Sequence, residues 1–396
     1  MPSSLTAAAE ALLAADLDPS VTPLVAAAQS HLRAVLSGTP HGRDVALARA
    51  ARGDTPGEAE SEAIFRELLS GDLGEGVAAA LLLVLRPTTL AAPTLAGFAR
   101  VLRDAAIPVR PRLPAGTMIA DTCGTGSDGV GTFNVSTTVM FLLAAAGIRV
   151  AKHGNRGVTS RCGSADVLEA LGVAIDLDAK GVAACIEEAG VGFMFAPKFH
   201  PAMAAVQPLR RRLAEEAPPA LRGPTVFNVL GPLANPARAT RQVIGVYDPA
   251  LVPTVAEVAR RLGLERALVV HGAGGLDEVS TLGPTLVAEL QAGEVTSREV
   301  TPEQADVPRV ADVTVFAGGD AARNAEITRA ILSGDDVGPR ASLVFLNAAA
   351  GLYCCDRVGS LAAGVTEARR LVASGAAREA LDTLRETSVA LRGSSV

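Results

Sequence analysis

The stretch "DTCGTGSDGVGTFN", residues 121–134, lies between an apolar run and a pattern typical of a helix. Its glycines permit positive φ and close approach of a ligand to the backbone. A helix expected to begin between Asn134 and Thr138 would direct its first N–H groups toward the same place. The stretch therefore predicts a strand, a glycine-rich loop suited to phosphate or pyrophosphate, and a helix start. A tight strand-to-helix turn without a ligand is the alternative.

Four later segments repeat this design, since each is a short apolar run that ends in glycines or polar residues before a helical pattern. They read "IRVAKHGN", "VGFMFAPKFH", "QVIGVYDP" and "ALVVHGAGG". The alternation indicates a parallel sheet wrapped by helices. The polar clusters would then meet at the carboxyl edge of the sheet, where open α/β proteins bind ligands. Between them, "GSADVLEALG" predicts a short helix with Ser164 as its N-cap.

The first 115 residues differ, because they contain many Ala and Leu at helical spacing and almost no β-branched clusters. We therefore predict an α/β protein with a small N-terminal helical domain and a larger α/β domain, whose mainly parallel central sheet is flanked by helices. The expected parts are a helical extension over 1–55, a helical domain over 56–115 joined by a helical segment near 200–215, and the α/β domain over 116–396.

The composition and charge of the chain argue against nucleic acid and membranes as binding partners. The net charge of −6 and the pI of about 5.5 give no basic surface for nucleic acid or an anionic membrane. The longest apolar runs are about half as long as a membrane span requires. The N-terminus has no basic segment before an apolar one, which predicts a cytoplasmic protein. Five cysteines without a CxxC pair fit neither a disulfide framework nor a zinc site.

The residues near the loop favour a polyanionic ligand. No Gly-Lys-Ser/Thr ends the loop and no acidic residue follows at the spacing of a dinucleotide site, so an ATPase or a dehydrogenase is disfavoured. Lys152, Arg156 and Arg161 concentrate positive charge in an acidic protein. Asp277 and Glu278 are adjacent carboxylates suited to a Mg²⁺ ion bound mainly through substrate phosphates and water, although such pairs are also common in solvated turns.

From roughly residue 58 to its end, the sequence resembles the anthranilate phosphoribosyltransferases of tryptophan biosynthesis. The matching motifs are "GTGSDGVGTFNVST", "KHGNRGVTSRCGSADVLEALG", "FMFAPKFHPAM", "TVFNVLGPLANPA", "HGAGGLDE" and "LNAAAGLY". The resemblance implies a Mg²⁺-dependent transfer of 5-phosphoribose from 5-phosphoribosyl-1-pyrophosphate (PRPP) to the amino group of anthranilate. It also implies a homodimer that forms through the helical domain.

The resemblance assigns residues to each ligand. PRPP would contact Gly124, Thr125, Gly126, Asp128, Gly129, Thr132, Asn134, Ser136, Thr137, Lys152 and Ser160, and Mg²⁺ would contact Ser136, Asp277 and Glu278. The acceptor would lie against Gly124, His153, Asn155 and Arg210, with the arginine paired to the carboxylate. His153 and Lys152 are the catalytic candidates. His153 is expected to position the acceptor, because an aromatic amine is already neutral near pH 7.

Three other readings stay open. About eight extra residues around "AEEAPPAL" follow Arg210, so a different aromatic amine or carboxylate could replace anthranilate, although His153 and Asn155 keep the family pattern. A pyrimidine nucleoside phosphorylase shares the architecture but would need an arginine- and lysine-lined site in place of the acidic pair. A non-enzymatic relative that binds nucleic acid would need a basic stripe and stacking aromatics, whereas this chain has no Trp and two Tyr.

Overall fold

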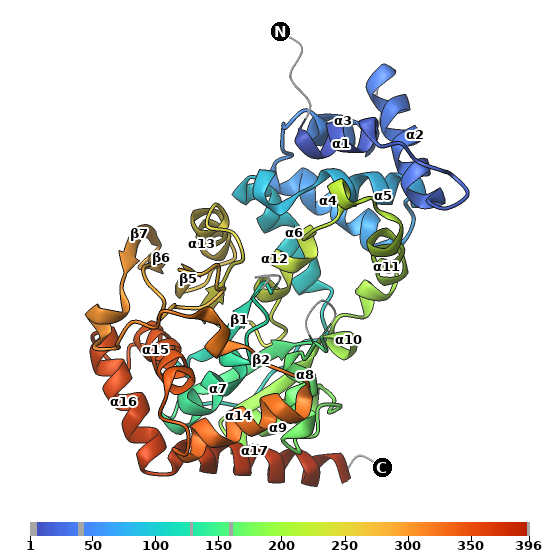
Figure 1. The fold of residues 1–396 in the computed structure, drawn as a ribbon. Helices are drawn as coiled ribbons and strands as arrows, with labels where there is room; N and C mark the ends of the chain where they lie inside the picture. Colours follow the sequence, from blue (N-terminus) through green and yellow to red (C-terminus); the bar gives the residue numbers. More distant parts are fainter. Residues whose placement is uncertain (1–5, 39–42, 127–129, 158–160, 394–396) are drawn as a thin grey trace. The chain divides into compact units, whose positions relative to one another are not determined.

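The computed structural model describes residues 6–38, 43–126, 130–157 and 161–393 (Figure 1). Internal contacts divide the chain into two compact units. The helical unit comprises the residues up to Ala106 together with His200–Ala234, and the α/β unit comprises Ile107–Phe199 and Asn235–Val396. Each unit is therefore built from two separate segments of the chain.

The helical unit is held together by closely packed helices. Phe65 on α4 stacks on Phe98 of α6 with ring centroids 4.8 Å apart, and Phe227 of α12 lies 5.6 Å from Phe65. A Cβ at Gly97 would lie 2.5 Å from the carbonyl oxygen of Glu58, so α4 and α6 approach closely. The elements are α1 (Ala7–Ala14), α2 (Pro23–Ser37), α3 (Arg43–Ala51), α4 (Glu58–Ser70), α5 (Glu75–Val84), η1 (Pro87–Thr89), α6 (Ala92–Asp104), η2 (Pro201–Ala204), α11 (Gln207–Glu216), η3 (Pro219–Leu221) and α12 (Val226–Leu233).

The α/β unit contains a seven-stranded sheet with the order β3-β2-β1-β4-β5-β6-β7. The first five strands are parallel, and β6 and β7 add an antiparallel hairpin at one edge. The predicted fold class is confirmed. All five predicted strands form, but the sequence reasoning missed the hairpin. The strands are β1 (Ile119–Gly124), β2 (Arg149–Gly154), β3 (Val191–Phe195), β4 (Arg241–Gly245), β5 (Arg266–Gly272), β6 (Thr285–Gln291) and β7 (Glu294–Val300).

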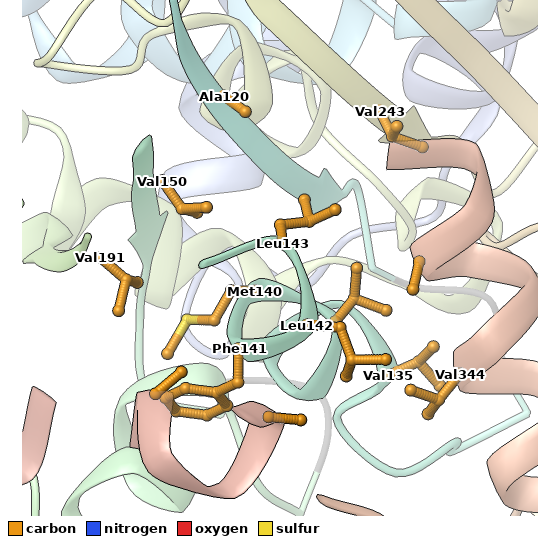
Figure 2. Close-up of a cluster of buried hydrophobic side chains, with 14 of the residues drawn as sticks. Ala120, Val135, Met140, Phe141, Leu142, Leu143, Val150, Val191, Val243 and Val344 are labelled. Atoms are coloured by element: carbon orange, nitrogen blue, oxygen red, sulfur yellow. The ribbon is translucent and has the colours of Figure 1, made fainter. Parts of the chain in front are cut away.

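Helix α7 (Val135–Ala145), which follows the glycine-rich loop, lies in the hydrophobic core of this unit. Eight of its eleven residues are buried, and it packs against β1, β2 and α15. Figure 2 shows its side chains between residues of the strands and Val344 of α15. The unit's other helical elements are α8 (Ser164–Ala170), α9 (Ala179–Glu188), α10 (Ala196–Phe199), α13 (Leu251–Arg261), η4 (Pro302–Ala305), η5 (Val313–Phe316), α14 (Ala321–Ser333), α15 (Pro339–Cys354), α16 (Leu361–Ala373) and α17 (Ala376–Gly393).

The strand order places a switch point between β1 and β4. From β1 the chain continues to β2 and β3 on one side, and then returns to β4 and β5 on the other side. In open α/β sheets the crevice for ligands forms outside the carboxyl ends of the two strands at such a point. Gly124 and Gly245 are the last residues of these strands and are paired in register.

Among the residues that the structure describes, none of the helices combines the length and the apolar character that a bilayer crossing requires.

Candidate active site

The acidic pair, Asp277 and Glu278, lies directly against the carboxyl ends of three strands. A Cβ at Gly124 would lie 2.3 Å from Asp277 Oδ2, and one at Gly245 would lie 1.6 Å from the Asp277 carbonyl oxygen. A Cβ at Gly272 would lie 2.4 Å from the Glu278 carbonyl oxygen. Only glycine therefore leaves room for the turn that carries both carboxylates.

The glycine-rich loop is anchored to the same turn at its first residues. The N–H of Gly126 donates to Asp277 Oδ2 at 2.9 Å, and the N–H of Thr125 donates to the Gly245 carbonyl at 2.9 Å. The Thr125 hydroxyl accepts from the N–H of Tyr247 at 3.0 Å. Gly126 has φ of 61°, a conformation that favours glycine. In this structure these two amides hold the loop on the sheet edge.

Lys152 is buried near the carboxyl edge of the sheet, and its side chain is hydrogen-bonded to Ser136. Its side chain is only 2% exposed, and Nζ donates to the Thr122 carbonyl at 2.5 Å and to Ser136 Oγ at 3.2 Å. The Thr122 hydroxyl donates to the Ser136 carbonyl at 3.0 Å. A small pocket opens here, and its lining includes Ser136 and Glu278. The full lining is Thr122, Cys123, Ser136, Val139, Val243, Gly245, Glu278 and Asn347.

Asp121 is a buried carboxyl group near Lys152. Its pKa is raised because burial outweighs the charge of Lys152 and the side-chain amides of Asn235 and Gln242, which act to lower it. Asn235 Nδ2 donates to Asp121 Oδ2 at 2.8 Å. A buried amine such as that of Lys152 is costly unless polar groups surround it, and here they are the Thr122 carbonyl, Ser136 Oγ and the nearby Asp121 carboxyl group.

Cys123 contributes a thiol to the pocket lining. Burial raises the pKa of the Cys123 thiol well above its usual value, and the carboxylate of Asp121 raises it further. The thiol is therefore protonated at neutral pH and is a poor nucleophile.

The start of α7 offers backbone donors. None of the described side chains caps this helix, so the N–H groups of its first turn, including those of Ser136 and Thr137, are available to an anion. The N-cap residue is Asn134. Its Oδ1 accepts from Asn324 at 2.8 Å and its Nδ2 donates to the Cys162 carbonyl at 3.4 Å. Asn134, which was predicted to contact phosphate, thus connects its own segment with those of Cys162 and Asn324 in this structure.

The remaining predicted residues fall in different places. Thr132 forms a β-bridge with Ala317. His153 is half-buried near the end of strand β2, and Asn155 is exposed just after it. The structure thus brings Gly124, Thr125, Gly126, Ser136, Lys152, Asp277 and Glu278 together at one edge. Asp128, Gly129 and Ser160 lie outside the described residues.

Asp166 closes the turn that follows β2. Its Oδ2 accepts from the N–H groups of Gly157 at 2.8 Å and Gly163 at 2.9 Å, and its Oδ1 accepts from Arg156 at 2.9 Å. The prediction of Ser164 as N-cap is wrong. Gly163 is the N-cap, and Ser164 is already the first helical residue, because the carboxylate of Asp166 satisfies the Gly163 N–H.

We expect Asp166→Asn to lower the free energy of unfolding by about 1 kcal/mol at pH 7. Burial alone would raise the pKa of Asp166, but the N–H donors of Gly157 and Gly163 and the charge of Arg156 outweigh it and lower the pKa below 3.8. The carboxylate therefore stabilises the fold above pH 3.8, and the contribution is lost as the pH falls through the lowered pKa. Urea unfolding of both proteins at pH 7 and below pH 3.8 checks this, and a difference that does not shrink in acid contradicts it.

Arg210 belongs to the helical unit, on α11. Its guanidinium lies 4.6 Å from the centroid of the Phe227 ring and donates to Gln207 Oε1 at 3.2 Å. Burial lowers its pKa, and no carboxylate of the described residues offsets this effect. The side chain is thus a half-buried cation whose partners are an aromatic ring and an amide.

The sequence reasoning missed two residues that shape this site. The sequence marks Gly245 only as the end of a strand, although its lack of a side chain leaves room for Asp277. Asn347 lies in the motif "LNAAAGLY", which indicates no role for it, although it lines the pocket and accepts a hydrogen bond from the N–H of Val279, next to Glu278. Both contacts join residues far apart in sequence, so no local pattern marks them.

Comparison with known proteins gives matches over most of the chain. The pattern of the family described as "Glycosyl transferase family, a/b domain" matches residues 116–378. An anthranilate phosphoribosyltransferase of Symbiobacterium thermophilum is 44% identical over 349 residues, which cover 88% of this chain and 98% of the relative.

Two solved structures are similar as well. The crystal structure of anthranilate phosphoribosyltransferase from Thermus thermophilus has a TM-score of 0.78 and 40% identity, covering 88% of this chain and 99% of that chain. The anthranilate phosphoribosyltransferase from Saccharomyces cerevisiae in complex with PRPP and Mg has a TM-score of 0.72 and 26% identity, covering 92% and 98% respectively.

Proposed function

Because the chain belongs to the anthranilate phosphoribosyltransferase family, we propose that it transfers the 5-phosphoribosyl group of PRPP to the amino group of anthranilate and releases pyrophosphate. The observation that carries the proposal is the packing of Asp277 and Glu278 against the glycine ends of β1, β4 and β5. Glu278 lines the same pocket as Ser136, which belongs to the first turn of α7, and Asp277 immediately precedes Glu278 in the turn. A pyrophosphate with a divalent cation matches that combination of groups.

The donor set fits Mg²⁺. Glu278 and Ser136 line one pocket and offer hard oxygen ligands, and the neighbouring Asp277 can add a third. Within the described ranges, no group of three or more His, Cys, Asp or Glu forms a metal site. The other ligands would be substrate phosphates and water, which Mg²⁺ commonly keeps. When bound, Mg²⁺ would neutralise negative charge on the departing pyrophosphate.

The chain's own residues would bind and orient the substrates. Displacement at the anomeric carbon builds negative charge on the leaving group, which the first-turn N–H groups of α7 would stabilise. Since the ammonium of Lys152 donates to Ser136 Oγ, the hydroxyl proton of Ser136 is turned away from it and can donate to a phosphate oxygen. His153, at the end of β2, would border the acceptor. Alignment of two bound substrates then supplies much of the rate acceleration.

Arg210 is the residue we assign to the acceptor carboxylate. A guanidinium can pair with a carboxylate through two parallel hydrogen bonds. In the described residues this guanidinium has an aromatic ring and an amide as its partners, and burial lowers its pKa. A bound carboxylate would therefore supply the negative charge that the described surroundings of Arg210 do not provide.

We expect Arg210→Ala to raise the KM for anthranilate with little change in the KM for PRPP. A lost hydrogen bond to a charged group is worth about 1.5–3 kcal/mol, or roughly 10- to 150-fold in affinity. Arg211 is exposed on the same helix, so Arg211→Ala is the matched control and should leave both values near those of the wild type. Steady-state kinetics with each substrate varied checks the prediction. An unchanged anthranilate KM removes Arg210 from the acceptor site.

The proposed reaction is tested by incubating the protein with PRPP, Mg²⁺ and anthranilate while following the fluorescence of anthranilate. We expect a loss that requires both PRPP and Mg²⁺, with stoichiometric release of pyrophosphate. If PRPP binds but anthranilate is not consumed, the acceptor is a different aromatic amine or carboxylate. If PRPP does not bind, the proposed function is wrong.

We further propose that the protein works as a homodimer in the cytoplasm. The support is the resemblance of the sequence to the family, whose members dimerise through the helical part. Sedimentation velocity at micromolar concentration tests this, and a species of monomer mass only would contradict it.

A further inference from the structure

Asn347 is a polar residue in the middle of a buried apolar helix. It lies on α15, is 3% exposed, and is surrounded in sequence by alanine and leucine residues that are also buried. An amide in such a place is costly unless its polar atoms are hydrogen-bonded. Packing of α15 alone would be served by an apolar side chain, so the amide has another role.

The side-chain amide of Asn347 makes all of its hydrogen bonds to backbone groups, and two of them are to Val279, the residue after the acidic pair. Oδ1 accepts from the N–H of Val279 at 2.8 Å, and Nδ2 donates to the carbonyls of Val279 and Leu343, each at 2.9 Å. These partners fix the orientation of the amide, because its oxygen faces an N–H and its nitrogen faces two carbonyl groups.

The two hydrogen bonds between Asn347 and Val279 restrain the peptide bond that follows Glu278. The Val279 N–H belongs to the peptide bond between Glu278 and Val279, and Asn347 holds it from one side. On the other side, the Glu278 carbonyl lies against Gly272, where a Cβ would be 2.4 Å away. Asn347 and Glu278 also line the same pocket. The backbone of Glu278 is thus fixed from two directions.

We propose that Asn347 is a positioning residue, which sets the direction of the Glu278 carboxylate toward the metal–pyrophosphate group. The inference rests on the proposed function. A group that orients a metal ligand through a hydrogen bond typically contributes about 10- to 100-fold to metal affinity. Loss of the two hydrogen bonds to the Val279 backbone would permit a displacement of its neighbour.

The test compares Asn347→Ala and Asn347→Ser with the control Ser388→Ala. Ser388 is 1% exposed on α17, and its Oγ accepts from the N–H of Ala174 at 3.1 Å, so the control also loses a buried bond to the backbone. Two quantities are measured for each protein. They are the Mg²⁺ dependence of turnover and the PRPP-supported binding of Mn²⁺, followed by electron paramagnetic resonance. Circular dichroism and thermal melting report folding.

We expect both Asn347 variants to need about tenfold more Mg²⁺ for half-maximal turnover and to bind Mn²⁺ about tenfold more weakly, while kcat at saturating Mg²⁺ stays within about threefold. Ser388→Ala should shift neither midpoint. Equal shifts in the control, shifts below twofold in the Asn347 variants, or failure of both variants to fold would overturn the proposal. If the wild type binds PRPP and Mn²⁺ but does not consume anthranilate, the proposed acceptor fails while the Mn²⁺ measurement still decides the role of Asn347.

Discussion

The double substitution Asp277→Asn with Glu278→Gln should reduce PRPP-dependent consumption of anthranilate by about 10³-fold. Both replacements keep the shape of the side chain but remove the negative charge that would bind Mg²⁺. The amide oxygen introduced at position 277 can still accept from the N–H of Gly126, so the loop should keep its anchor. PRPP-supported Mn²⁺ binding should be lost together with activity, while the melting temperature should change little.

A matched control pair lies near the amino end of strand β3, away from the carboxyl ends of the strands. Glu187 and Glu188 are also adjacent acidic residues, and they end α9 just before β3 begins. Glu187→Gln with Glu188→Gln should keep turnover within about twofold of the wild type. Retained activity in the 277/278 variant, or an equal loss in the 187/188 variant, would show that the acidic pair is not the metal site.

Gly245→Ala should have the second largest effect. The added methyl group would lie 1.6 Å from the Asp277 carbonyl oxygen, a separation that no side chain can adopt, so the turn with the acidic pair must move. We expect the free energy of unfolding to fall by about 1–3 kcal/mol and kcat/KM to fall by about 10²-fold. Thermal melting and steady-state kinetics measure the two effects on the same protein sample.

Gly359→Ala is the control for this change. A Cβ at Gly359 would meet no atom within 4 Å, and its φ is not in the left-handed region. The alanine should be tolerated there with wild-type activity. If Gly245→Ala behaves in the same way as this control, the close packing of the turn on β4 is not needed for activity.

The sequence predicted the parallel part of the sheet well, because each of its strands is a short apolar run followed by glycine or polar residues. The β6–β7 hairpin was missed for a physical reason. Strand β7 is an exposed edge strand with polar residues on both faces, so it lacks the alternation that marks a half-buried strand. Its turn consists of Ala292 and Gly293, both with positive φ, and alanine is not a residue that signals such a turn.

For the site, the sequence located the elements but not the contacts between them. Residues at and after the ends of strands were expected at one edge, and Gly126, Lys152 and Asp277 are found there. The hydrogen bonds that determine their orientation were not predictable, since Lys152 bonds to Ser136 and Gly126 bonds to Asp277 across long separations in sequence. A side chain's type reveals which bonds it can form, whereas the fold decides which partner it meets.

The division of the helical unit between two chain segments governs the order in which it can be completed on the ribosome. Phe65 and Phe98 are synthesised early, but the third ring of their cluster, Phe227, follows only after the residues of β1, β2 and β3. A nascent chain that has not reached residue 227 therefore exposes one side of this aromatic cluster. Translation must produce much of the α/β unit before the N-terminal helices acquire their full set of neighbours.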